Sequence, residues 1–84
     1  MALPREPVTL TVEQLDELHR KLSALRHDVN NHLTLIIAAV ELIRSRPAMA
    51  ERMMGTLVEQ PPKIAAALNL FSSEVERTLG LRNL

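Results

Sequence analysis

The stretch "RSRPAM", residues 44–49, separates two long patterns of apolar residues that have nearly the same length. Pro47 disfavours helical geometry at Arg46, the residue before it, and suits the first turn of a new helix. We therefore expect one helix to end at about residue 45 and another to begin at about residue 47. Two helices of equal length joined by so few residues pack side by side in opposite directions.

The first helix is expected over residues 11–45. Thr11 can cap its start, and Gln14 can reach back to Thr11 to form a capping box. From there, apolar residues recur at the alternating spacing of three and four that is typical of a coiled-coil seam. The series is Leu15, Leu18, Leu22, Leu25, Val29, Ile36, Ala39 and Ile43. His32 falls in this series without being apolar.

The second helix is expected over residues 47–79, and Gly80 is expected to end it in the left-handed conformation. Its apolar series is Met53, Leu57, Ile64, Leu68, Phe71 and Val75. Pro61 and Pro62 interrupt this pattern, because each proline removes a backbone donor and crowds the preceding turn. They indicate either a kink near 61–62 or the start of a third helix. We favour one kinked helix, since the seven-residue spacing continues across the prolines.

The fold class that follows is all-α: an antiparallel two-helix hairpin over residues 11–80, with an extended segment over 1–10 and a C-terminal tail over 81–84. The stretches "LTLIIAAVELI", residues 33–43, and "MMGTLV", residues 53–58, are apolar on more than one face of a helix. Two helices cannot cover that much apolar surface by themselves. We therefore expect a homodimer in which two hairpins form a four-helix bundle.

Composition narrows the classes of function. The chain has 84 residues, ten basic and ten acidic side chains, no cysteine, and Phe71 as its single aromatic residue. The balanced charge gives no indication of binding to nucleic acid or to an anionic membrane. The longest apolar run, residues 35–40, is far too short to span a membrane, and the N-terminus lacks the apolar core of a signal peptide. We expect a soluble, cytoplasmic protein that makes no membrane contact through this segment.

A polar cluster, "RHDVNNHLTLI" at residues 26–36, lies in the middle of the first helix. In heptad positions, His27 faces away from the seam, Asp28 and Asn31 lie beside it on the outer surface, and His32 faces inward. Taken alone, an exposed histidine usually has no role. An inward histidine is more often a hydrogen-bonded residue of the core than a ligand.

Metal binding by these histidines is not expected. Helical histidine pairs that bind zinc are four residues apart, whereas His27 and His32 are five apart and point about 140° away from each other. His19 lies two turns before His27, too far to share an ion. We expect no metal site in this chain.

The residues "HDVNNHLTLI" resemble the histidine box of two-component sensor kinases, which lies in their dimerisation and histidine phosphotransfer domain. They are also similar to the motif H-D-x-x-N-x-L of the sporulation-type histidine phosphotransferases. The resemblance implies a helical hairpin that dimerises into a four-helix bundle. This architecture is the one that the apolar spacing predicts independently.

The resemblance also implies roles for individual residues. By position, His27 would accept the phosphoryl group, and Asp28 would orient its imidazole and help to remove its proton. Asn31 would position the water that dephosphorylates a response regulator. The surface that docks the receiver domain is expected to include Arg26, Asn30 and Thr34.

The chain departs from this family in two respects. Many such kinases have a proline at the position of His32, which bends the first helix; here Pro61 and Pro62 would lie at a similar height on the second helix, because His27 is expected to lie level with Ile64. Furthermore, no part of the sequence reads as an ATP-binding domain. We expect the chain to bind no cofactor itself, so ATP and magnesium would come through a kinase domain, in cis or in trans, and through the receiver.

The leading interpretation is a histidine phosphotransfer and dimerisation module, either a domain of a sensor kinase or a stand-alone phosphotransferase. The alternative from another class is a structural coiled-coil hairpin that dimerises or binds a partner without chemistry. A third possibility is a histidine phosphotransfer protein whose four helices come from one chain, although the count of two helices argues against it.

Overall fold

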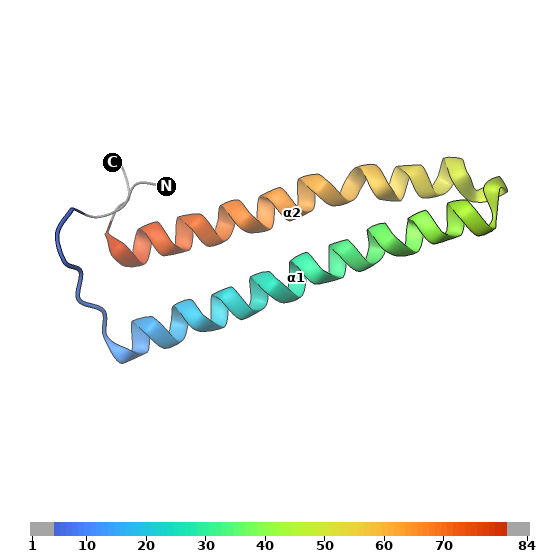
Figure 1. Ribbon diagram of the computed structural model, residues 1–84. Helices are drawn as coiled ribbons and strands as arrows, with labels where there is room; N and C mark the ends of the chain where they lie inside the picture. The colour runs from blue at the N-terminus through green and yellow to red at the C-terminus, as the bar shows by residue number, and fades with distance from the viewer. Residues whose placement is uncertain (1–4, 81–84) are drawn as a thin grey trace.

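The computed structural model describes residues 5–80, which form a single helical hairpin (Figure 1). Helix α1 spans Val12–Ser45, a short 3-10 turn, η1, spans Pro47–Met49, and helix α2 spans Ala50–Leu79. The molecule measures 57 × 25 × 13 Å, so it is one layer of two helices. The all-α hairpin is therefore confirmed, and a four-helix bundle made by one chain is wrong for the described residues.

The ends of the helices follow the predicted local chemistry. The Thr11 hydroxyl accepts a hydrogen bond from the backbone N–H of Gln14 at 3.0 Å, and the Gln14 side chain accepts one from the N–H of Thr11 at 2.8 Å. This is the predicted capping box, which satisfies two backbone donors that the first helical turn leaves free. Gly80 adopts φ 73°, the left-handed conformation expected at the end of α2.

The turn differs slightly from the prediction. Pro47 does begin a helical turn, but this turn is the 3-10 segment η1, and α2 begins three residues later, at Ala50. The backbone N–H of Met49 donates to the carbonyl of Arg46, a three-residue closure that fits a tight reversal.

Helix α2 runs without interruption through Pro61 and Pro62. The alternative of a third helix beginning at these prolines is therefore wrong. Both prolines are exposed, so their rings do not displace the packing between the helices. The expected kink near 61–62 stays a prediction.

The contact between the helices uses the predicted apolar series only in part. On α1, the half-buried or buried members run from Leu18 to Ile43, and Ala39 is 2% exposed. Leu15 and Leu22, which were expected to face α2, are 54% and 38% exposed. A straight helix drifts by about 20° per heptad relative to a strict seven-residue repeat, so the earliest members of the series turn away from the contact.

These two leucines belong to a second apolar stripe, which we call the apolar flank. It comprises exposed residues of both helices: Leu15, Leu22, Leu33, Ile37, Val40, Met54, Val58 and Leu68. We count 100° of rotation about the helix axis per residue, in the direction of the chain. On each helix, the flank residues then lie about 90° further round the axis than the residues that contact the other helix. Because the helices are right-handed and antiparallel, a rotation of the same sign on both falls on the same side of the hairpin. The stripes of the two helices therefore lie on the same side of the hairpin.

The hairpin covers little of its apolar surface. Among residues 5–80, only Ala39 and Gln60 are buried. A helix pair in water normally needs further elements to cover such a surface. In the hairpin, the two helices therefore pack against each other along their facing sides, and the apolar flank is exposed to solvent.

Candidate functional site

The His27 side chain is exposed and lies near the middle of α1, as the sequence predicted. Its direction is about 150° from the contact with α2 and about 120° from the apolar flank. The ring therefore points away from both surfaces that pack or are available for packing. A partner molecule can approach it from solvent.

Asn31, one turn further along α1, lies within hydrogen-bonding distance of this ring. Its Nδ2 atom is 3.3 Å from Nε2 of His27, and both side chains are exposed. An amide NH₂ group can only donate, so this contact is a hydrogen bond when Nε2 carries no proton. In this arrangement the neutral imidazole bears its proton on Nδ1.

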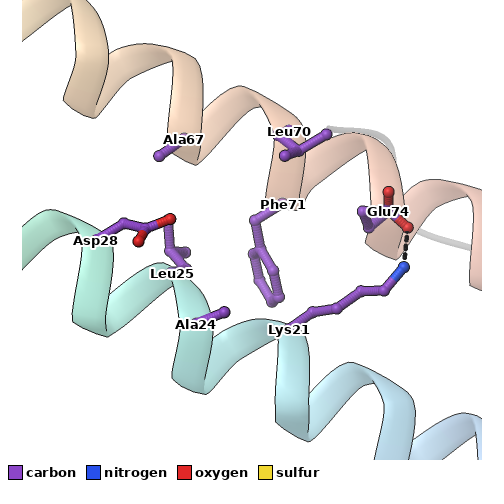
Figure 2. A pocket seen from close by; sticks show the side chains of 8 residues that line it. All are labelled: Lys21, Ala24, Leu25, Asp28, Ala67, Leu70, Phe71 and Glu74. Carbon is purple, nitrogen blue, oxygen red and sulfur yellow. Dashed lines mark hydrogen bonds and ion pairs between the residues drawn. The ribbon is translucent and has the colours of Figure 1, made fainter.

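The role that the family resemblance implies for Asp28 requires its carboxylate to contact the His27 ring. In this structure the Asp28 side chain points elsewhere. Its side chain is exposed and turns toward the groove between the helices, where it lines a pocket (Figure 2). Within residues 5–80, the hydrogen bond recorded for the His27 ring comes from Asn31 and not from Asp28. The structure thus brings His27 and Asn31 together and sets Asp28 beside them.

The three expected docking residues are all exposed on α1. Thr34 lies on the same side of the helix as His27, two turns along, and Asn30 lies about 60° from it. Arg26 is rotated by about 100° from His27, toward the apolar flank. Thr34 and Asn30 therefore share the surface around His27, whereas Arg26 lies on the apolar flank, between Leu22 and Leu33.

His32 faces the interior, as predicted, and has a partner there. Its Nδ1 atom is 2.7 Å from Oε1 of Gln60, and Nε2 of Gln60 donates to the carbonyl of Thr56 at 3.0 Å. Because the amide nitrogen of Gln60 is already donating to Thr56, its oxygen accepts from Nδ1–H of His32. The interpretation of His32 as a hydrogen-bonded core residue is confirmed.

Gln60 is the residue that sequence reasoning missed. It is 2% exposed, although glutamine is usually a surface residue. A signal was available, because Gln60 lies three residues after Leu57 and four before Ile64, where the apolar spacing demands an inward position. The sequence predicted that His27 lies at the same height as Ile64 of the opposite helix. That alignment would put His32 at the height of Glu59, one residue from its observed partner, Gln60.

A pocket of about 190 Å³ opens between the helices on the side opposite to the apolar flank (Figure 2). Its lining is Lys21, Ala24, Leu25, Asp28, Ala67, Leu70, Phe71 and Glu74. Lys21 and Glu74 form an ion pair at one end of the pocket, and Arg77 also contacts Glu74. The hydrogen bond from Lys21, together with the positive charges of Arg77 and Lys21, lowers the pKa of Glu74 below its ordinary value.

Other kinds of site find no support in the described residues. Among residues 5–80, no three His, Asp or Glu side chains gather closely enough to hold a metal ion. In the same part of the chain, neither helix combines the length and the apolar character that crossing a membrane requires.

Comparison with known proteins gives no relative: no family model, no curated protein and no solved structure matches this chain.

Proposed function

We propose that this chain is a homodimeric histidine phosphotransfer module, in which His27 exchanges a phosphoryl group with an aspartate of a receiver domain. The observation that carries the proposal is the exposed His27 ring with Asn31 at its Nε2 atom, within the motif H-D-x-x-N-x-L. A phosphoaccepting imidazole needs an unprotonated nitrogen with an open path for in-line attack. The first condition fits Nε2 with Asn31 donating to it, and the exposed outer face of α1 meets the second condition once the Asn31 amide turns aside.

The apolar flank supports the dimeric part of the proposal. Ile37 and Val58 on this flank are 64% and 68% exposed, which is unusual for large apolar side chains in a group. A second hairpin placed on the flank covers these residues and completes a four-helix bundle. His27 points away from the flank, so dimerisation leaves the ring free in both copies.

The chemistry assigned to the residues is what the resemblance to the histidine box implies for them. Nε2 of His27 attacks the phosphorus of the receiver's aspartyl phosphate, the P–O bond breaks, and its electron pair returns to the aspartate carboxylate. Asp28, next to His27 in the chain, stabilises the positive charge that builds up on the ring. In the reverse process and in hydrolysis, the amide of Asn31 positions the attacking group. Magnesium belongs to the receiver.

The module has no ATP-binding domain in the sequence described, so its phosphoryl group comes from a kinase domain, in cis or in trans, or from a receiver. Receivers and kinase domains of this type work in the cytoplasm, which is where the proposal places this segment. Thr34 and Asn30 lie on the surface next to His27 and form the expected edge of the receiver contact.

The test uses receiver domains from the same genome, each phosphorylated with acetyl phosphate and freed of the donor. We expect at least one of them to transfer an acid-labile, alkali-stable phosphate to the chain, and we expect the variant His27→Gln to accept none. His19→Gln is the matched control, because His19 is also an exposed histidine of α1. Equal labelling of the His27→Gln variant and the native chain would disprove the assignment.

The second candidate function is a structural hairpin that dimerises or binds a partner without chemistry. The exposed apolar flank favours it as much as it favours the first, because the flank requires a partner but not a reaction. The two differ in the transfer experiment. A chain that dimerises and takes no phosphate from any receiver would be such a hairpin.

A further inference from the structure

The hydrogen bond between Asn31 and His27 has a chemical consequence for the ring. Nε2 is the ring nitrogen next to Asn31, and its single lone pair accepts from Nδ2 of Asn31 at 3.3 Å. A nitrogen whose lone pair is engaged in a hydrogen bond cannot attack phosphorus until that bond is broken. The group that fixes the tautomer therefore also covers the nucleophile.

We propose that Asn31 shields His27 in the resting module: its amide holds the imidazole in the Nδ1–H tautomer and occupies the Nε2 lone pair until it rotates away. The hydrogen bond lowers the free energy of the resting ring and so raises the barrier to attack. A docked receiver offers the Asn31 amide other acceptors, including phosphoryl oxygens. Small phosphodonors in solution do not, so the shield lowers the reactivity of His27 toward them.

This inference rests on the proposed function for its biological meaning, but the shield is tested without any receiver. The two exposed polar residues one helical turn to either side of His27 provide a matched pair. Asn31 lies one turn after His27 and contacts it, whereas Ser23 lies one turn before it and makes no hydrogen bond to the ring within residues 5–80. Alanine is a better helix former than asparagine or serine at an exposed position, so neither substitution to alanine threatens folding.

The first experiment measures the tautomer by long-range ¹H–¹⁵N NMR of the His27 ring at alkaline pH. We expect the Nδ1–H tautomer to predominate in the native chain and in Ser23→Ala. In Asn31→Ala the ring should revert to the Nε2–H tautomer that an unrestrained imidazole favours. In Asn31→Asp a carboxylate would face Nε2, accept from it and enforce Nε2–H. A native ring that is mainly Nε2–H would overturn the proposal.

The second experiment measures the reactivity of the ring with potassium phosphoramidate. In this reaction Nε2 forms a bond to phosphorus, the P–N bond of the donor breaks, and its electron pair leaves with ammonia. We expect Asn31→Ala to accept phosphate at Nε2 about two- to tenfold faster than the native chain, the factor that a modest hydrogen bond represents. Ser23→Ala should react at the native rate. An unchanged or slower rate in Asn31→Ala would refute the shield.

The results separate the shield from the proposed function. If the tautomer and the phosphoramidate rate both depend on Asn31 while no receiver transfers phosphate to His27, the shield stands and the phosphotransfer proposal fails. If receivers transfer phosphate to His27 while both measurements ignore Asn31, the phosphotransfer proposal stands and the shield fails.

Discussion

Two histidines only five residues apart have opposite surroundings in this molecule. The ring of His27 is exposed and contacts the amide of Asn31, which is itself free to rotate in solvent. The ring of His32 is half-buried and contacts Gln60, an amide that is fully enclosed and held by a second hydrogen bond to Thr56. The exposed contact between His27 and Asn31 suits a reaction in which side chains must move. The buried contact between His32 and Gln60 suits a fixed structural role.

We predict that the Gln60→Ala variant is less stable by about 1–3 kcal/mol, because it leaves the inward nitrogen of His32 without a partner. Urea unfolding followed by circular dichroism, at a fixed protein concentration, measures this difference. The neighbouring exposed residue provides the control, and Glu59→Ala should change the free energy of unfolding by less than about 0.5 kcal/mol. Equal stability of the two variants would show that the buried amide contributes nothing.

A paired substitution separates the hydrogen bond from the volume of the side chains. Replacing both partners with leucine, in His32→Leu with Gln60→Leu, removes the bond without leaving a polar atom unsatisfied. We expect this double variant to lose less stability than Gln60→Ala alone. A larger loss in the double variant would mean that packing, not hydrogen bonding, fixes this layer.

The candidate site could be predicted at this scale only in part. Heptad position alone places His27 outside and His32 inside, because a helix has a fixed angle per residue. The contact between Asn31 and His27 was not predicted, since it depends on the side-chain rotamers of two exposed residues. Gln60 was missed because glutamine is usually a surface residue, although its spacing from Leu57 and Ile64 indicates an inward position. The spacing was the better guide.

At the scale of the elements, the ends of the helices were the most predictable features. The capping box of Thr11 and Gln14 and the left-handed Gly80 each depend on a few neighbouring residues, so local sequence determines them. The start of α2 was less certain, because a proline fits the first turn of a 3-10 helix as well as that of an α-helix.

The two prolines inside α2 are the least favourable feature of either helix. Pro61 and Pro62 cannot donate to the carbonyls of Leu57 and Val58, which are four residues before them. A proline in the middle of a helix costs roughly 3 kcal/mol relative to alanine. The helix nevertheless continues, which means that its packing against α1 outweighs this cost.

We predict that replacing both prolines, in Pro61→Ala with Pro62→Ala, raises the stability of the hairpin by several kcal/mol, roughly the cost of two interior prolines. Thermal unfolding followed by circular dichroism should show a higher midpoint. Pro47→Ala is the control and should not raise it, because Pro47 lies in a first turn, where a proline is favourable. An unchanged midpoint in the double variant would indicate that α2 already relaxes around the prolines without cost.

At the scale of the whole molecule, the sequence predicted a hairpin with apolar surface left over at residues 33–43 and 53–58, where five of the eight flank residues lie, but not that the surface extends to the other end of the hairpin. Leu15 and Leu22 were assigned to the contact with α2, and the structure exposes them on the apolar flank instead. A strict seven-residue pattern cannot separate the two surfaces, because the drift of a straight helix moves residues gradually from one to the other. The full extent of the flank required coordinates.

We predict that a charge on the apolar flank prevents dimerisation and that the same charge on the opposite side does not. Ile37→Glu and Val58→Glu each place a carboxylate on the flank, where a partner would have to desolvate it. Leu70→Glu is the matched control, since Leu70 is 64% exposed, as Ile37 is, but borders the pocket on the other side. Analytical ultracentrifugation should give a dimer for the native chain and for the control.

The flank variants should sediment as monomers, or as unfolded chains if the hairpin cannot stand alone. Dimers of unchanged affinity in both flank variants would mean that the flank is not the interface. A loss of dimer in Leu70→Glu alone would place the interface on the side of the pocket.

The buried amide of Gln60 also restricts the longitudinal alignment of α1 relative to α2. Moving α1 by seven residues in either direction would bring Leu25 or Ala39 opposite Gln60 in place of His32. The amide oxygen would then face hydrocarbon with nothing to accept from, a misalignment that a purely aliphatic seam would tolerate. One polar pair therefore selects a single longitudinal alignment of α1 and α2, and with it the residues of α2 that lie level with His27.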